Sequence, residues 1–277
     1  MEKTLITICT VNYNSSEFID VMLYAFSKLT FHSYKVIIRD NNSTRKDFKK
    51  LEYIIKKYKN VTLYKVKTLS TGSVAHGEAL NDLVSKIDTE YGVIIDADAT
   101  FLIKDWDKIL INKMNNILPI YGTQADIGSG KFEDFPLMFA MIFKTDILKD
   151  LQIDFRPRDL SKFEDTGWEL REKFLKGGFN GGLLYDFNTR LYKKGPFANI
   201  VCSEYYLSPD GTNDQIFACH FGRGSAPKSK NLVKVDAGSN IFLRIINKAL
   251  SVFNVLKWKK DKKVWLTICK KIINEQS

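Results

Sequence analysis

The sequence has few prolines, glycines and cysteines, and it has no long hydrophobic run. Six prolines and 16 glycines among 277 residues are too few for a collagen-like chain or a Pro- or Gly-rich linker. The four cysteines are scattered without a Cys-x-x-Cys pair, so neither a zinc ribbon nor a disulfide framework is expected. The first 30 residues lack the pattern of a signal peptide, and no segment approaches the roughly 18 apolar residues of a membrane span.

The residues that are present form the composition of a folded protein with an excess of positive charge. Hydrophobic residues make up 44% and charged residues 27% of the chain, which excludes an intrinsically disordered protein. The length suits one large α/β domain or two smaller domains. With 42 Lys and Arg against 32 Asp and Glu, the net charge is +10, and such a surface attracts phosphates, nucleic acid or an acidic membrane face.

Strand-like and helix-like segments alternate over the first hundred residues. Short apolar, β-branched runs predict strands at residues 4–9, 34–38, 61–66 and 91–95. Helical periodicity follows the first three strands, at residues 16–29, 48–55 and 75–87. Alternation of this kind predicts crossover connections and a parallel sheet with helices on its faces.

Polar clusters follow three of these strands, at residues 12–15, 40–43 and 96–98. Because ligands of such sheets bind beyond the carboxyl ends of the strands, the clusters are expected to meet at one site. Asp96 and Asp98 can face the same side of an extended segment, where two carboxylates suit Mg²⁺ or Mn²⁺ bridging to a diphosphate. An Asp-x-Asp pair alone is more often a solvated turn, but its position after a buried strand favours function.

The ends of the first two strands offer candidates for contact with a nucleotide base. Asp40 can accept a hydrogen bond from the imide N–H of uracil or thymine, or it can form an Asx-turn and helix cap. Thr10, Val11 and Tyr13 can present backbone groups and an aromatic ring to the same base, or they can pack inside a buried loop. Both pairs of alternatives stay open.

In combination, the landmarks of this chain resemble a family 2 glycosyltransferase of the GT-A fold, over roughly residues 4–225. The matching segments are Thr10-Val11-Asn12-Tyr13-Asn14-Ser15, Asp40-Asn41-Asn42-Ser43, Gly72 through Asn81, Tyr91-Gly92-Val93-Ile94-Ile95-Asp96-Ala97-Asp98 and Phe163-Glu164-Asp165. The resemblance implies a Rossmann-like α/β domain with a mostly parallel central sheet flanked by helices. It also implies a nucleotide-sugar donor, commonly a UDP-sugar, and a divalent metal.

The resemblance further implies roles for individual residues at the strand ends. Asp40 would hold the base, Asp96 would lie near the ribose or the metal, and Asp98 would ligate the metal directly. His220, at the end of a strand-like run, would be a third metal ligand, and an imidazole ligand favours Mn²⁺ over Mg²⁺. The alternative for His220 is a satisfied, partly buried histidine.

Basic residues near the donor are less well defined. His76 occupies a place where the family often has a basic residue near the nucleotide, although an ordinary helix-start histidine is the alternative. Leu80 stands where an arginine is common, which leaves the contacts to the diphosphate open. Arg223, in a Gly-containing turn, can approach the phosphates.

Asp165 is the candidate general base, because in the resembling family an acidic pair at this place takes the proton from the acceptor hydroxyl. Ser161 and Glu164 form the pattern of a capping box for a helix that stops at Gly177. A carboxylate near that helix N-terminus would stay ionised, and a dry pocket would raise its basicity. Alternatively, Asp165 only caps the helix, with Glu164 or Glu169 as the base.

The C-terminal segment differs from the rest of the chain. From residue 240, an apolar stripe predicts an amphipathic helix, followed by a lysine cluster at 257–263 and a second apolar pattern. We expect a catalytic domain at residues 1–235 and a basic, helical C-terminal extension at residues 236–277. The extension either lies on an anionic membrane surface or packs on the catalytic domain or a second subunit.

The favoured hypothesis is an inverting, metal-dependent glycosyltransferase that moves a sugar to a hydroxyl of a glycan or lipid-linked saccharide acceptor in surface-polysaccharide biosynthesis. We expect it in the cytoplasm, either free or peripheral on the inner face of the membrane. The alternatives are a non-enzymatic basic module for membrane or nucleic acid, and a nucleotidyltransferase. No RNA-recognition or zinc module is present, so no nucleic-acid partner is expected. The loop after the first strand contains no glycine, which argues against a nucleotidyltransferase.

Overall fold

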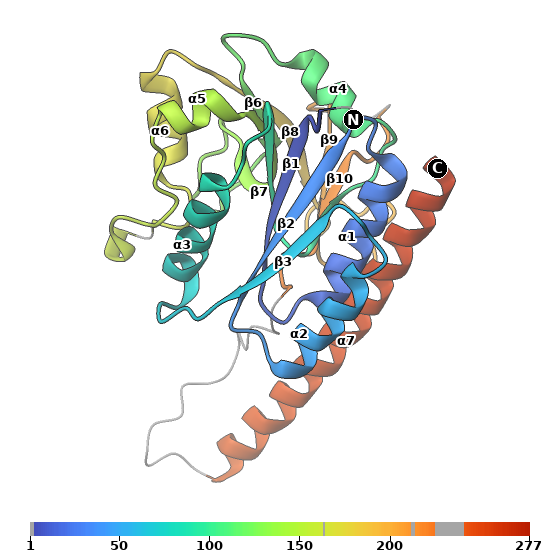
Figure 1. Ribbon diagram of the computed structural model, residues 1–277. Helices are drawn as coiled ribbons and strands as arrows, with labels where there is room; N and C mark the ends of the chain where they lie inside the picture. Colours follow the sequence, from blue (N-terminus) through green and yellow to red (C-terminus); the bar gives the residue numbers. More distant parts are fainter. Residues whose placement is uncertain (1–2, 163, 212–213, 225–240) are drawn as a thin grey trace.

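The computed structural model describes residues 3–162, 164–211, 214–224 and 241–277, with residues 241–251 described by their backbone alone. The strands in these residues form one mixed sheet in the order β3-β2-β1-β4-β7-β6-β8-β9-β10-β5. Its parallel part consists of β1 (Ile6–Asn12), β2 (Tyr34–Asn41), β3 (Val61–Val66) and β4 (Tyr91–Ile95). The helices between these strands are α1 (Ser16–Leu29), α2 (Arg45–Ile55) and α3 (Gly72–Ser85). The predicted alternation and parallel pairing are confirmed (Figure 1).

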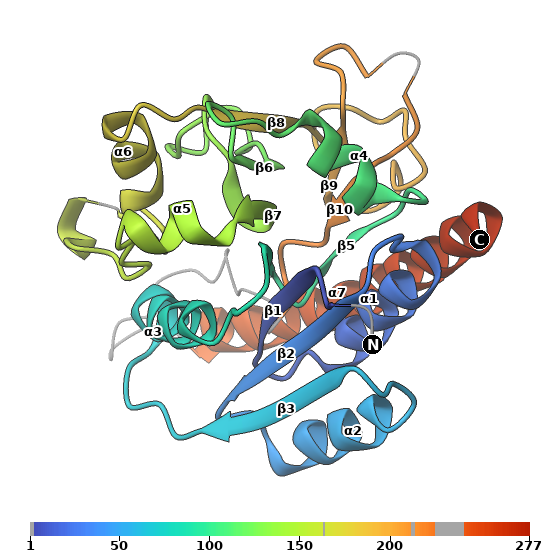
Figure 2. The same ribbon diagram turned by 45° about the horizontal axis from the view of Figure 1, so that its top comes forward.

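Beyond β4 the sheet becomes mixed. Its further strands are β7 (Leu137–Lys144), β6 (Ile120–Thr123), β8 (Gly181–Asn188), β9 (Ser203–Tyr206), β10 (Ala218–His220) and β5 (Ala99–Phe101). Neighbours in this part pair antiparallel, except that β6 and β8 are parallel. Short helices accompany these strands (Figure 2): α4 (Trp106–Lys113), α5 (Thr145–Asp150) and α6 (Glu169–Lys176). The expected α/β class, with a mostly parallel set of core strands flanked by helices, is confirmed.

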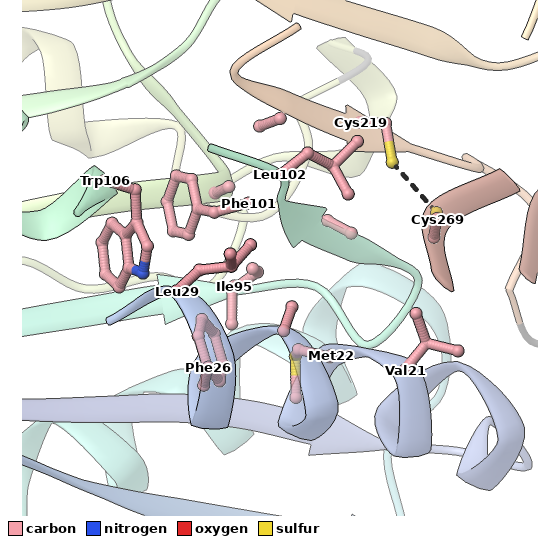
Figure 3. Close-up of a cluster of buried hydrophobic side chains, with 14 of the residues drawn as sticks. Val21, Met22, Phe26, Leu29, Ile95, Phe101, Leu102, Trp106, Cys219 and Cys269 are labelled. Carbon is pink, nitrogen blue, oxygen red and sulfur yellow. Dashed lines mark hydrogen bonds between the residues drawn. The ribbon is translucent and has the colours of Figure 1, made fainter. Parts of the chain in front are cut away.

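Continuous apolar runs in the central strands explain why helices cover both faces of the sheet. Along β4, Val93 and Ile95 belong to the hydrophobic cluster around α1, whereas Ile94 belongs to the cluster on the α3 side. Successive side chains of a strand point to opposite faces, so a run without polar residues needs cover on both. Figure 3 shows how α1 packs on this sheet through Met22, Phe26, Ile95, Phe101 and Leu102.

The predicted capping box at Ser161 and Glu164 is wrong, because α6 begins only at Glu169. Ser161 lies in the short 3-10 helix Leu160–Lys162. The Glu164 carboxylate accepts hydrogen bonds from two backbone N–H groups of the preceding loop, which competes with helix formation. Gly167 then adopts a φ of +75°, a left-handed conformation that interrupts any helix starting earlier.

The C-terminal helix α7 (Ile241–Gln276) lies alongside α1 (Figures 1 and 2). Trp265 is fully buried, and its ring centroid lies 5.5 Å from that of Phe18 in α1 and 6.1 Å from that of Phe221. The sulfur atoms of Cys219 and Cys269 lie 3.5 Å apart in the same interior, as reduced thiols (Figure 3). One face of the predicted extension therefore packs on the domain.

Two expectations about this region are not tested by the structure. The domain boundary between residues 235 and 236 falls outside the described residues and stays a prediction. Most of the predicted apolar stripe falls on residues 241–251, whose side chains are not described. No helix within the described segments is both long and apolar enough to cross a lipid bilayer.

Replacing Trp265 by alanine should lower the free energy of unfolding by about 3–5 kcal/mol, because the indole fills a fully buried space between α1 and α7. Leu256→Ala in the same helix is the matched control, since this side chain is 60% exposed and its removal should change stability by less than about 0.5 kcal/mol. Urea unfolding followed by circular dichroism measures both. Equal effects of the two substitutions would contradict the packing of α7 on the domain.

Candidate functional site

A cleft of about 1050 Å³ opens where β1, β2, β4 and β10 end. Each of the three predicted polar clusters contributes to it. The contributing side chains from these clusters are Tyr13, Ser15, Asn41, Asn42, Asp96 and Asp98. The predicted convergence of the clusters at one edge of the sheet is confirmed.

Asp96, Asp98 and His220 place three potential metal-ligand atoms within 4.8 Å of one another. The Nε2 atom of His220 lies 3.3 Å from an Asp98 oxygen and 3.7 Å from an Asp96 oxygen. Two carboxylates and one imidazole are donors that Mn²⁺ accepts, whereas Mg²⁺ prefers oxygen donors alone. The residues present therefore fit a divalent cation.

Burial and mutual charge set the protonation of these three groups. Burial raises the pKa of Asp96, and the nearby His76 and His220 offset this only in part. For Asp98, burial is outweighed by His220 and by backbone hydrogen bonds, so its pKa is lowered. Burial lowers the pKa of His220, but the two carboxylates outweigh it and raise the pKa overall. The site thus favours a positive charge between its carboxylates.

The turn that carries Asp96 and Asp98 is fixed from two sides. The backbone N–H of Asp96 donates to the carbonyl of Phe139 in β7, and the N–H of Phe221 donates to the carbonyl of Asp98, both at 2.9 Å. The loop after β10 approaches so closely that a Cβ atom on Gly224 would lie 2.7 Å from the carboxyl carbon of Asp98. Only glycine permits this approach, which brings the loop against the two aspartates.

Arg223 links this turn to the C-terminal helix. Its backbone N–H donates to the Asp98 carboxylate at 2.9 Å. Its guanidinium pairs with Asp261 of α7 at 3.2 Å and donates to the carbonyl of Val201 at 2.8 Å. Arg223 lines the cleft, but its charge is engaged away from the metal-ligand group, and its predicted approach to phosphates stays a prediction.

Asp40 and Thr10 do not line the cleft. The strand β2 continues to Asn41, so the side chains of Asp40 and Asn41 point to opposite faces, and only Asn41 reaches the cleft. The fully buried Asp40 carboxylate accepts hydrogen bonds from the Asn12 side chain at 2.8 Å and from the Ser43 N–H at 3.2 Å. The carboxylate thus holds the turn that follows β2, which agrees with the structural alternative for Asp40 rather than with contact to a base. Direct contact between Asp40 and a base requires these bonds to rearrange.

The remaining candidates for the nucleotide site lie in the cleft. Val11 and Tyr13 line it, and the Tyr13 ring is half exposed. His76, in the first turns of α3, places its Nε2 atom 3.6 Å from an oxygen of Asp96. The histidine therefore adds a second imidazole to the acidic pair.

This arrangement agrees with one family of proteins. The sequence profile described as glycosyl transferase family 2 matches residues 7–177, from β1 to the end of α6. The chain belongs to this family. The match contains both aspartates of the metal-ligand group and Asp165, whereas His220 and Arg223 lie beyond it. The resemblance expected from the sequence landmarks is confirmed.

Solved structures share this fold. A mannosyltransferase, PcManGT from Pyrobaculum calidifontis, solved with GDP-Man and Mn²⁺, is 16% identical, with a TM-score of 0.52 over 65% of this chain and 55% of that one. TarS of S. aureus is 18% identical, with a TM-score of 0.51 over 66% of this chain and 36% of that one. The chain therefore spans about half or less of the length of these proteins. No curated protein sequence matches it.

Asp165 lines the cleft of this family 2 chain, but its carboxylate is already occupied. It accepts hydrogen bonds from the Thr166 N–H and the Ser73 hydroxyl, and it forms an ion pair with Lys131 at 2.7 Å. Burial raises the pKa of Asp165, but Lys131 and the hydrogen bonds outweigh it and lower the pKa to about 2. The expectation that a dry pocket makes this group more basic is therefore wrong.

The helix near Asp165 is also a different one from that predicted. Its partner Ser73 lies in the first turn of α3, whereas α6 begins four residues after Asp165. The alternatives Glu164 and Glu169 do not line the cleft. Among the described members of the motif at 163–165, Asp165 is therefore the better placed candidate base; Phe163 lies outside the described residues.

Sequence reasoning missed three charged residues of the cleft: Asp126, Lys131 and Arg190. Asp126 accepts hydrogen bonds from Asn188 and from a serine of β9. The neighbouring Asp186 has its pKa raised to about 7 by burial and by the charge of Asp126. Glycines around Lys131 predict a loop, but no local pattern indicates that this loop folds over Asp165.

Lys131→Met should raise the pKa of Asp165 from about 2 toward the ordinary aspartate value near 4, because loss of the ammonium group removes the charge that favours the carboxylate. Titration of the carboxyl carbon by NMR measures the change. Lys162→Met is the matched control, since this exposed lysine pairs with Asp159 instead. An unchanged titration in Lys131→Met would mean that Ser73 and Thr166 alone hold the carboxylate ionised.

Proposed function

We propose that the chain is an inverting, metal-dependent glycosyltransferase that moves a sugar from a nucleotide-sugar donor, most simply a UDP-sugar, to an acceptor hydroxyl. The observation that carries the proposal is the convergence of Asp96, Asp98 and His220 with Asp165 in one cleft at the sheet edge. Membership in family 2 supports it. The complex of the mannosyltransferase with GDP-Man and Mn²⁺ supports the donor class and the cation.

In this proposal, Asp98, Asp96 and His220 hold a divalent cation, with Mn²⁺ favoured by the imidazole donor. When bound, the cation supplies Lewis-acid assistance to a departing diphosphate. Side chains of the protein bind the rest of the donor. Val11 and Tyr13 offer contacts to the nucleoside, and His76 offers a cationic group beside Asp96 when protonated.

Asp165 takes the proton from the acceptor hydroxyl in this mechanism. The hydroxyl oxygen then attacks the anomeric carbon from the side opposite to the diphosphate, which inverts the configuration there. Because the ion pair with Lys131 stabilises the Asp165 anion, proton removal is efficient only after Lys131 has moved away from it. The lysine is then free to meet another anion in the cleft.

We further propose a glycan or lipid-linked saccharide as the acceptor, in the synthesis of a surface polysaccharide. Arg190 lines the cleft without an ion-pair partner among the described residues, and together with the net charge of +10 it suits an anionic substrate. Family membership favours sugar transfer over a non-enzymatic basic module and over a nucleotidyltransferase. A cytoplasmic location stays a prediction.

UDP should raise the Tm of the wild-type protein only when Mn²⁺ is present, and Asp98→Ala should abolish this increase, because it removes one carboxylate of the metal-ligand group. At a hundredfold excess over Kd the stabilisation is about 2.7 kcal/mol, or roughly 5–10 °C. Asp88→Ala, an exposed carboxylate that pairs with Lys35, is the matched control and should keep the increase. Absence of any shift with UDP, GDP or dTDP in the wild type would contradict the donor class.

Asp165→Asn should still bind donor but transfer sugar about 10²–10⁴ times more slowly, because the amide cannot accept the proton of the acceptor hydroxyl. Mn²⁺-dependent hydrolysis of a panel of nucleotide sugars, with water as the acceptor, measures the rate. Asp134→Asn, which removes an exposed carboxylate paired with Arg171, should leave the rate unchanged. Turnover retained in Asp165→Asn would assign the base to another group.

A further inference from the structure

The side of α7 that faces away from the domain carries an apolar patch, formed by Val252, Phe253 and Leu256. These side chains are 55, 62 and 60% exposed, respectively. At about 100° of rotation per residue, they fall within roughly a third of the helix circumference. Leu256 precedes the buried Trp265 by nine residues, which puts the two on opposite sides of the helix. The apolar patch therefore takes no part in packing on the domain.

Lysines continue the apolar patch along the helix. Lys260 and Lys263 follow Leu256 by four and seven residues, so they extend the same stripe. The exposed lysines of this region, none of which has an ion-pair partner within the described part of the chain, are Lys257, Lys259, Lys260 and Lys263. By contrast, Lys262 on the packed side pairs with Glu17 of α1. The outer stripe thus combines free positive charge with exposed apolar side chains.

We infer that this stripe of α7 binds the surface of an anionic lipid bilayer. Apolar side chains of an interfacial helix enter the boundary between headgroups and acyl chains, while lysines on the same helix contact lipid phosphates. The apolar patch and the four lysines supply both components. A second copy of this chain is a poorer occupant, because it would bring the same lysines and its own net charge of +10 to the interface.

The helix holds the apolar patch close to the cleft. Trp258 donates from Nε1 to the carbonyl of Arg223 at 2.8 Å, and Asp261 pairs with the guanidinium of Arg223. Arg223 in turn lines the cleft. Phe253 precedes Trp258 by five residues, or about 8 Å along the helix axis. Figure 1 shows the first turns of α7 extending beyond the domain at the end where β1 and β2 stop.

This geometry places the rim of the cleft beside the lipid surface. An acceptor hydroxyl attached to a lipid anchor would then reach the cleft without leaving the bilayer, a step that rests on the proposed function. Binding to lipid does not rest on it. The two are separable, because the lipid experiment uses no donor, metal or acceptor.

The experiment is flotation of the purified full chain with vesicles of phosphatidylcholine, with or without phosphatidylglycerol. The wild type should float only with the anionic vesicles and should dissociate as salt is raised. The double variants Phe253→Ser with Leu256→Ser, and Lys260→Glu with Lys263→Glu, should each lower the vesicle partition coefficient by roughly tenfold or more. Circular dichroism and thermal unfolding establish that each variant is folded.

Matched controls lie around α4, at the opposite end of the molecule (Figure 1). Ile117→Ser removes a similarly exposed apolar side chain, and Lys104→Glu with Lys113→Glu reverses two exposed lysines. Both should bind vesicles as the wild type does. The inference would be overturned if the wild type did not float, or if the α4 and α7 variants lost vesicle binding equally. It would also be overturned if the protein bound no vesicles but self-associated, and if Phe253→Ser with Leu256→Ser abolished that self-association. Loss of the UDP and Mn²⁺ effect with flotation intact would contradict only the proposed function.

Discussion

The site depends on one buried carboxylate, that of Asp98. It lies 3.3 Å from the His220 imidazole and accepts the backbone N–H of Arg223 at 2.9 Å, so the same group forms the metal-ligand set and holds the loop after β10. Burial alone would raise the pKa of a carboxylate at this depth. These partners instead lower it. The charge that a cation needs is therefore created by contacts between segments more than 100 residues apart.

Local sequence patterns predicted correctly those strands whose formation depends mainly on their own residues. The predicted strands at 61–66 and 91–95 coincide with β3 and β4, because β-branched, aromatic and apolar residues dominate both runs. The second strand is longer than predicted, since polar Asp40 and Asn41 still pair with β3. Because the strand includes both residues, Asn41 faces the cleft and Asp40 points to the opposite face. A candidate expected in a turn after residue 38 is thus held in the interior, because the strand runs past its predicted end.

The sequence does not show which charged side chains lie next to the candidate base. The motif around Asp165 was recognisable, and the residue does line the cleft. Its basicity, however, depends on Lys131, which lies 34 positions earlier in a loop whose path no periodicity defines. A dry pocket alone would raise the pKa of Asp165 and make it a stronger base, but the ion pair and the hydrogen bonds lower the pKa instead. Without a bound substrate, the protein therefore holds its candidate base in an ion pair.

The C-terminal helix packs on the domain that carries the cleft. Trp265, Cys269 and Ile273 are members of the hydrophobic cluster that contains residues of α1 and β4, so the core includes side chains of this helix. The helix also engages Arg223, whose backbone holds Asp98. Its buried side thus supports the loop that completes the metal-ligand group, while its outer side carries the apolar patch and free lysines. A lipid surface bound to this helix would therefore be linked to the Asp98 carboxylate. The link consists of the ion pair between the Asp261 and Arg223 side chains and the hydrogen bond from the Arg223 backbone.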